Sequence, residues 1–222
     1  MLLDLLLYCD SYMPFLSIVV YMLLRKSIDK RENIILVYCI LSFIIFFISG
    51  ILSSHKIHNL YLYHIYSLVE LILLSAYILK LITGKWYSKL FFGIAIGYSL
   101  LWVANILFLE SIEDMNANSA VLEYTILLFL CMIYFLRLAK KDEILYFQKL
   151  PTFWIVSGFL VYCALSLLIQ MSYKYFVAHG VVDEAKTVWP VMFVAIIAKF
   201  VLISVGLLCY KRSYSSRHLL LL

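Results

Sequence analysis

The stretch from His58 to Lys80 reads HNLYLYHIYSLVELILLSAYILK and is almost continuously apolar from Leu60 onward. About 20 apolar residues in a helix span the roughly 30 Å hydrocarbon core of a bilayer. Near its midpoint this run carries one glutamate, Glu70. A membrane-length helix with a carboxyl group at its centre is the feature from which we interpret the rest of the chain.

Apolar runs of this kind recur, and at least seven can be distinguished along the 222 residues. They predict an all-α fold, a polytopic membrane protein with a bundle of seven transmembrane helices. No connecting loop is long enough to form a soluble domain, so residues 1–222 are expected to be a single transmembrane bundle. The predicted spans are about 5–24, 34–52, 60–79, 90–109, 120–136, 151–171 and 189–210.

Composition excludes several other classes of protein. The chain is 65% hydrophobic, whereas soluble domains are about half apolar, so soluble and disordered chains are excluded. The apolar runs are continuous rather than alternating, which disfavours a β-barrel. The five cysteines are scattered without a CxxC pair, so neither a disulfide framework nor a metal cluster is predicted.

Basic residues alternate between the two ends of the predicted bundle. The loops after the first, third and fifth spans, with the C-terminal segment, hold 14 of the 18 lysines and arginines. Because basic loops stay on the cytoplasmic side, the N-terminus is predicted outside and the C-terminus in the cytoplasm. The expected location is a bacterial inner membrane. The net charge of +5 follows from this topology, and no nucleic-acid partner is expected.

The last span contains an ionisable residue at a depth similar to that of Glu70. Lys199 lies about ten residues from the outer end of its span, as Glu70 does, which places both about 15 Å deep. Equal depth allows a Glu70–Lys199 ion pair if the third and seventh spans are neighbours. Ionisable residues at this depth usually face the bundle interior and mark function, but a buried pair can also be purely structural.

Other polar residues gather in the predicted outer half of the bundle. His64, Tyr66 and Ser67 precede Glu70 along one helical stripe, and Tyr162 lies near mid-depth in the sixth span. Together with Glu70 and Lys199, these candidates for ligand binding predict an outward-facing polar vestibule with the charged pair at its floor. The other candidates are Asn105, Glu123 and Gln170, and Asp10 is a further polar residue of the same outer half.

Structural interpretations stand beside this one. Asn105 and Gln170 are of the type that joins membrane helices by hydrogen bonds. Glu123 is close enough to the end of its span to be simply solvated.

The histidines and the motifs of the chain bear on two further possibilities, a metal site and an enzyme active site. His55, His58 and His64 cluster around the start of the third span, and three histidines can bind zinc. Their spacing matches no metal motif, and they gather at the face opposite to the one that carries the ligands in ceramidase-type and adiponectin-receptor-type zinc hydrolases. The chain also contains no GxSxG, HExxH or P-loop motif. No metal ligands and no catalytic residues are therefore predicted.

The segment VAIIAKFVLISVGLL resembles the last helix of microbial rhodopsins, which also have seven helices and an outside N-terminus. This resemblance implies Lys199 as an attachment site for retinal and Glu70 as its counterion. The chain departs from the rhodopsin pattern at Ala195, where rhodopsin pumps usually have aspartate. The arginine-containing motif of the rhodopsin third helix is also absent.

Two further segments, HNLYLYHIYSLVE and PTFWIVSGFLVY, resemble small seven-helix integral membrane proteins of Bacteroidetes-type bacteria, a family without an assigned activity. The resemblance implies that the third and sixth spans share a site or an interface.

These observations lead to three functional hypotheses. The first is a non-enzymatic, receptor-like or sensory module that binds a small-molecule ligand through the vestibule. It would contact the lipid bilayer and a membrane or cytoplasmic signalling partner, and it needs no cofactor. The second is a transporter of small molecules or ions, or a rhodopsin-like protein with retinal on Lys199. The third is an intramembrane enzyme, although an enzyme is the less favoured class.

Overall fold

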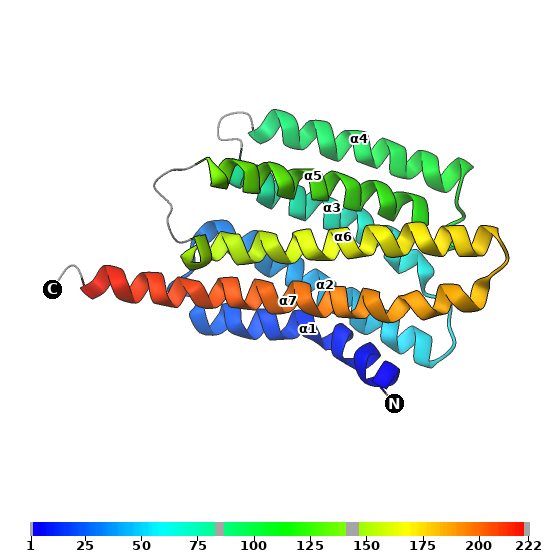
Figure 1. Ribbon diagram of the computed structural model, residues 1–222, viewed down its shortest axis with the longest axis horizontal. Coiled ribbons are helices and arrows are strands. Elements are labelled where there is room, and N and C mark those ends of the chain that lie inside the picture. The colour runs from blue at the N-terminus through cyan, green and yellow to red at the C-terminus, as the bar shows by residue number, and fades with distance from the viewer. Residues whose placement is uncertain (1, 83–86, 141–146, 220–222) are drawn as a thin grey trace.

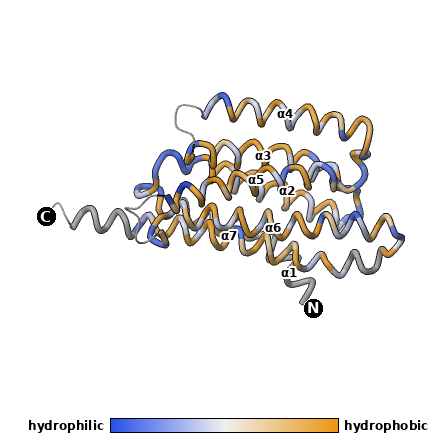
Figure 2. Tube along the Cα trace, turned by 45° about the horizontal axis from the view of Figure 1, so that its top comes forward, coloured by the Kyte–Doolittle hydropathy of each residue, from blue (hydrophilic) through white to orange (hydrophobic). Residues whose placement is uncertain are grey.

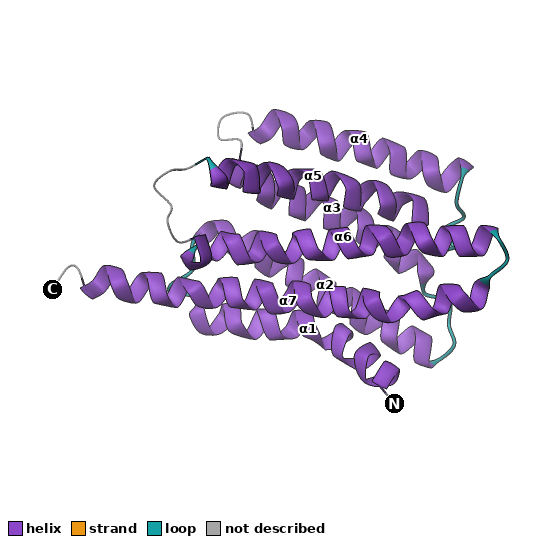
Figure 3. Ribbon diagram, viewed as in Figure 1, coloured by secondary structure: helices purple, strands orange, loops and turns teal. Residues whose placement is uncertain are grey.

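The computed structural model describes residues 2–82, 87–140 and 147–219, and within these ranges it describes the side chains of residues 11–82, 87–140, 147–181 and 187–211. The described residues form long helices, and no strand occurs among them (Figure 3). Two short 3-10 turns, Lys30–Glu32 and Phe147–Lys149, precede α2 and α6. The helices are α1 Leu2–Leu24, α2 Asn33–Ser54, α3 Leu60–Ile82, α4 Tyr87–Phe108, α5 Ala117–Ala139, α6 Pro151–Ala178 and α7 Val182–Leu219.

Six of these helices contain a segment that is long and apolar enough to cross a membrane. The apolar part of α1 with described side chains, Ser11–Leu24, is shorter, and this helix contains Pro14. Each predicted span coincides with a helix, although α6 and α7 extend well beyond their predicted spans. Hydrophobic residues follow the middle of the helices, whereas hydrophilic residues concentrate at the two ends of the bundle (Figure 2).

The helices form a closed ring with one helix outside it. Around the ring, α1 packs against α2, α2 against α3, α3 against α5, α5 against α6, α6 against α7 and α7 against α1. α4 lies outside the ring, where it packs mainly against α3 (Figure 1). We call the six helices α1, α2, α3, α5, α6 and α7 the helix ring. Its interior is where side chains from non-adjacent helices can meet.

Two glycines bring α6 and α7 into close contact. A Cβ atom at Gly158 would lie 2.9 Å from the carbonyl oxygen of Lys199, and one at Gly206 would lie 2.7 Å from that of Pro151. Small residues let the backbones of membrane helices approach in this way. Because Tyr162 lies one turn after Gly158, the close approach also brings the ring of Tyr162 to the side chain of Lys199.

The two ends of the bundle differ in charge. One end, which we call the acidic end, carries the α4–α5 loop, residues 109–116, with Glu110, Glu113 and Asp114. The opposite end, the basic end, carries the α1–α2 connection with Arg25, Lys26, Lys30 and Arg31. Large apolar side chains between the two ends are exposed on the outside of the bundle, for example Leu100 at 66%, as lipid-facing residues are.

Candidate functional site: a buried ion pair inside the helix ring

The centre of the site is an ion pair between Lys199 of α7 and Glu70 of α3. The lysine Nζ lies 3.0 Å from the glutamate Oε1, and neither residue is more than 1% exposed. α3 and α7 do not pack closely against each other. The two side chains therefore meet across the interior of the ring, and the ion pair forms although the third and seventh spans are not neighbours.

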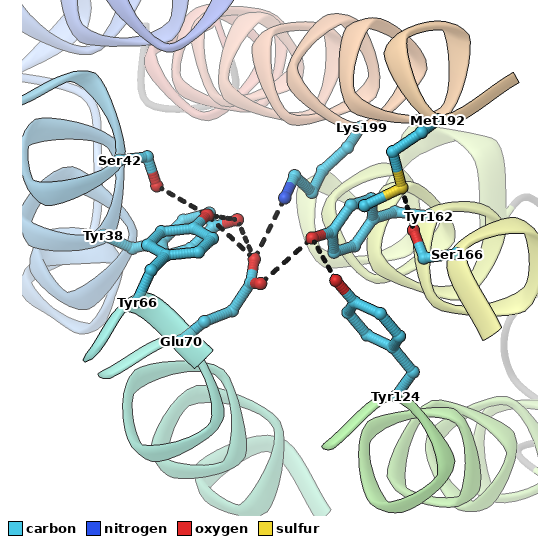
Figure 4. Close-up of polar contacts among 9 residues, drawn as sticks. All are labelled: Tyr38, Ser42, Tyr66, Glu70, Tyr124, Tyr162, Ser166, Met192 and Lys199. Carbon is cyan, nitrogen blue, oxygen red and sulfur yellow. Dashed lines mark hydrogen bonds and ion pairs between the residues drawn. The ribbon is translucent and has the colours of Figure 1, made fainter. Parts of the chain in front are cut away.

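Hydroxyl groups from three helices complete the environment of the Glu70 carboxylate (Figure 4). Tyr38 of α2 and Tyr66 of α3 donate hydrogen bonds to Oε1, at 2.6 and 3.0 Å. Tyr162 of α6 donates to Oε2 at 3.1 Å. A buried carboxylate needs such donors because its charge has lost the hydration of water. Four donors from α2, α3, α6 and α7 thus converge on one carboxyl group.

Aromatic rings surround the ammonium group of Lys199. The Nζ atom lies 3.3 Å from the centroid of the Tyr162 ring, with Phe200 at 5.0 Å and Tyr38 at 5.4 Å. The faces of such rings attract cations. Tyr162 therefore contacts both members of the ion pair, one through its ring and the other through its hydroxyl group.

A second layer of hydroxyl groups extends this network. Tyr124 of α5 and Tyr162 have hydroxyl oxygens 3.2 Å apart, and Ser42 of α2 lies 3.1 Å from the hydroxyl of Tyr66. Through these contacts, hydroxyl groups from α2, α3, α5 and α6 are connected to the charged pair (Figure 4). A separate contact joins α6 to α7, where Ser166 donates to the sulfur of Met192 at 3.2 Å.

Glu123 of α5 is a second carboxyl group in the interior. Its side chain is fully buried, so the interpretation that it is solvated is wrong. Neither of its oxygens has a hydrogen-bond partner among the described residues. Its carboxyl group lies close enough to Glu70 and Lys199 to interact with both electrostatically. The ring interior therefore holds two carboxyl groups around one ammonium group.

The acidic end closes over these residues. His64 is fully buried, and its Nε2 lies 3.0 Å from the carbonyl oxygen of Asp114 in the 109–116 loop. Asn116 of the same loop donates to the carbonyl oxygen of Tyr63 at 3.0 Å. The residues beneath this loop are buried, and Ser67, for example, is only 2% exposed. The vestibule expected from the sequence is therefore not open, because the loop is held against the start of α3.

Asn105 and Gln170 occupy different environments in the half of the bundle nearer the acidic end. Asn105 donates to Glu110 at 2.9 Å and to the hydroxyl of Ser119 at 3.0 Å, which ties α4 to α5 and to the loop between them. Gln170 is 4% exposed, and its Oε1 has no hydrogen-bond partner among the described residues. The side chain of Asp10 lies outside the described residues.

The three histidines near the start of α3 do not converge. The Nε2 of His58 lies 2.7 Å from the carbonyl oxygen of Glu113, whereas His64 contacts Asp114 and His55 is exposed. No group of three or more histidine, cysteine or acidic side chains with the geometry of a metal site occurs among the described residues.

A third buried carboxyl group lies at the basic end, in the connection between α1 and α2. Glu32 is fully buried and accepts a hydrogen bond from Tyr210 of α7 at 2.7 Å. Arg31 lies 3.8 Å away, and the hydroxyl of Tyr77 on α3 is close enough to interact with Glu32 electrostatically. We call Glu32, Tyr77 and Tyr210 the basic-end cluster.

Comparisons with models of known protein families, with curated proteins and with solved structures give no match. They support neither the resemblance to microbial rhodopsins nor that to the Bacteroidetes-type family. The helices and their lipid-facing surfaces establish the class: the chain is a polytopic helical membrane protein.

Proposed function

We propose that the chain crosses the membrane seven times, with the acidic end outside and the basic end in the cytoplasm of a bacterial cell. The distribution of lysine and arginine supports this orientation because basic loops are retained on the cytoplasmic side. α1 supplies the seventh crossing: it packs along both α2 and α7 within the helix ring.

Within this topology, we propose a non-enzymatic, receptor-like or sensory function. The observation that carries the proposal is the Glu70–Lys199 ion pair, which is buried at the centre of the ring and held by donors from several helices. A structural pair needs only two helices to be joined. Here one carboxylate is the common partner of α2, α6 and α7, so a change in its charge alters the contacts of three helices at once.

The proposed mechanism is a charge-controlled lock. In the locked state, Glu70 and Lys199 neutralise each other inside the ring. A ligand or a proton that changes the charge of either group leaves the other without compensation, which is costly in a buried site. The helices then move to a second arrangement. This movement changes the positions of the basic loops, which a signalling partner binds. Such a switch needs a ligand that interacts differently with the two states.

Distances between labels at the basic end test this function. Lys26 and Lys140 are exposed residues that follow α1 and α5, two helices on opposite sides of the ring. Spin labels on cysteines at these positions, in nanodiscs and with Cys9 and Cys209 replaced by serine, report the separation of the helix ends. We expect Glu70→Gln and Lys199→Met to shift the distance distribution, whereas Glu113→Gln, which neutralises an exposed acid, leaves it unchanged. Parent-like distributions in both variants would contradict the lock.

A transporter is the second candidate, and the burial of Glu123 beside Glu70 favours it. Paired carboxyl groups in the membrane interior occur along ion and proton pathways. This candidate predicts an ion or proton flux in proteoliposomes that Glu123→Gln abolishes. A sensor of the kind proposed above gives no flux above that of protein-free vesicles.

A further inference from the structure

We propose that Glu123 and Glu70 form a proton-binding site, in which the two carboxyl groups share one proton beside the ammonium group of Lys199. This proposal rests on the sensory function above and names the ligand of the same centre as a proton. It concerns a residue, Glu123, that the ion pair itself does not use.

Charge balance is the first step. Two carboxyl groups and one ammonium group lie together in a region where none of the three residues is more than 1% exposed. If all three were ionised, the ring interior would carry one uncompensated negative charge in the middle of the membrane. A charge in that position is costly. One proton on the carboxyl pair removes it.

Hydrogen bonding assigns the carboxylate and the acid. Glu70 accepts hydrogen bonds from Tyr38, Tyr66, Tyr162 and Lys199, which is the environment of an ionised carboxylate. Neither oxygen of Glu123 accepts a hydrogen bond from a described residue. Glu123 is therefore the group that carries the proton. An acid in this position can donate its O–H toward Glu70, with which it interacts.

A metal cation is a poorer neutralising ion than a proton here. Calcium takes six to eight oxygen ligands and magnesium an octahedral set. Among the described residues, no group of three or more acidic, histidine or cysteine side chains is arranged to hold a metal ion. A proton shared by Glu70 and Glu123 needs only one oxygen from each carboxyl group.

The other titratable groups around the pair come from every helix that packs against it. Most are hydroxyl or thiol groups that are neutral at physiological pH, so they do not supply the missing charge. They are Tyr38 and Cys39 on α2, Tyr66 on α3, Tyr98 on α4, Tyr124 on α5, and Tyr162 and Cys163 on α6. Among the residues whose side chains the structure describes, Lys199 is the one cation that interacts with both carboxyl groups.

Infrared spectroscopy of the intact protein in nanodiscs tests the proposal, because a protonated carboxyl group has a carbonyl band distinct from that of a carboxylate. Glu123→Gln removes the acid, so the band loses intensity. Glu70→Gln leaves one carboxyl group for one ammonium group, so the remaining proton is released and the band decreases by the same amount. Lys199→Met removes the ammonium group, so both carboxyl groups are protonated and the band increases by that amount.

The controls isolate this centre from the rest of the chain. Glu32→Gln measures the contribution of the other buried carboxyl group, and Glu113→Gln, at an exposed loop position, should leave the band unchanged. Glu123→Met gives the same readout if the amide variant does not purify as a folded protein. Spectra in sodium and in choline buffers should be identical.

The outcomes separate this proposal from the proposed function. Three results would each contradict the proposal that Glu70 and Glu123 share a proton. They are an unchanged carboxylic acid band in Glu123→Gln, a band retained in Glu70→Gln, and a band intensity that depends on sodium. If the band follows the expected pattern but label distances at the basic end do not respond to charge, the proton site stands and the sensory function fails. If the distances respond while the band does not follow the pattern, the function stands with a different ligand.

Discussion

The ring of Tyr162 lies 3.3 Å from the Nζ of Lys199, while the hydroxyl of the same tyrosine donates to Glu70 at 3.1 Å. One side chain of α6 thus contacts both charges of an ion pair formed by α3 and α7. Tyr162 thereby links α3 and α7, which do not pack closely against each other, at the depth of the ion pair. It also makes Tyr162 the residue whose two contacts can be separated by mutation.

Tyr162→Phe removes the hydrogen bond to Glu70 and keeps the ring beneath Lys199. We expect a loss of about 1.5–3 kcal/mol in the free energy of unfolding, typical of a hydrogen bond to a charged group. Tyr162→Leu removes the ring as well and should cost a further ~0.5–2 kcal/mol from the cation–π contact. Unfolding in mixed micelles measures both. Tyr12→Phe, at an exposed position, is the control, and equal stability of all three variants would contradict the dual role.

The contact between α6 and α7 predicts the effect of adding one methyl group. Gly158→Ala places a Cβ against the backbone of Lys199, and such overpacking costs about 1–3 kcal/mol. Gly97→Ala on α4 is the matched control, because nothing lies within 4 Å of a Cβ there. It should be neutral or stabilising by up to about 1 kcal/mol, the difference in helix propensity between the two residues. Equal effects of the two substitutions would show that α6 and α7 do not approach as described.

The basic-end cluster should behave as an independent unit of stability. Tyr210→Phe removes the hydrogen bond to buried Glu32, and we expect a cost of about 1.5–3 kcal/mol. Tyr77 follows Glu70 by seven residues on α3, which separates the two clusters by about 10 Å along the helix. At that separation the effects of Tyr210→Phe and Tyr162→Phe should add to within about 0.5 kcal/mol. Strong non-additivity would mean that the two clusters form one network.

Tyr98 provides a test of how the proposed proton reaches the surface. Its hydroxyl lies 3.3 Å from the hydroxyl of Ser67 and interacts electrostatically with Glu123, on the side toward the acidic end. Tyr98→Phe should leave the intensity of the carboxylic acid band unchanged and slow its hydrogen–deuterium exchange several-fold. Tyr12→Phe is again the control. A parent-like exchange rate in Tyr98→Phe would place the route elsewhere.

Helices were the part of the structure that the sequence predicted best. Each span is a long apolar run whose length is set by the bilayer, so the third span, expected at 60–79, is found as Leu60–Ile82. The Glu70–Lys199 contact could also be anticipated, since depth along a helix follows from residue number. Which helices are neighbours could not be anticipated, because apolar faces of membrane helices carry little information about their partners.

The rest of the site depends on long-range packing that sequence reasoning missed. Tyr38 donates the shortest hydrogen bond to Glu70, yet its sequence signal is only a four-residue spacing from Ser42 on the same helical face. Glu32 lies within a basic stretch that resembles any solvated loop, and its burial follows from Tyr210, 178 residues away. Glu123 is near the start of its span, where its position in the sequence indicates contact with solvent, yet its side chain is fully buried.

The most direct test of the central claim is a double-mutant stability cycle on Glu70→Gln, Lys199→Met and the pair, in nanodiscs. Each single variant removes the ion pair and leaves the other hydrogen-bond partners of the lost group unsatisfied, so we expect a loss of about 1.5–3 kcal/mol in the free energy of unfolding, even when a proton on or off Glu123 restores the charge balance. The double variant should lose clearly less than the sum of the two single effects, because both single variants remove the same contact. If the two single effects simply add in the double variant, Glu70 and Lys199 do not form the buried pair on which the account depends.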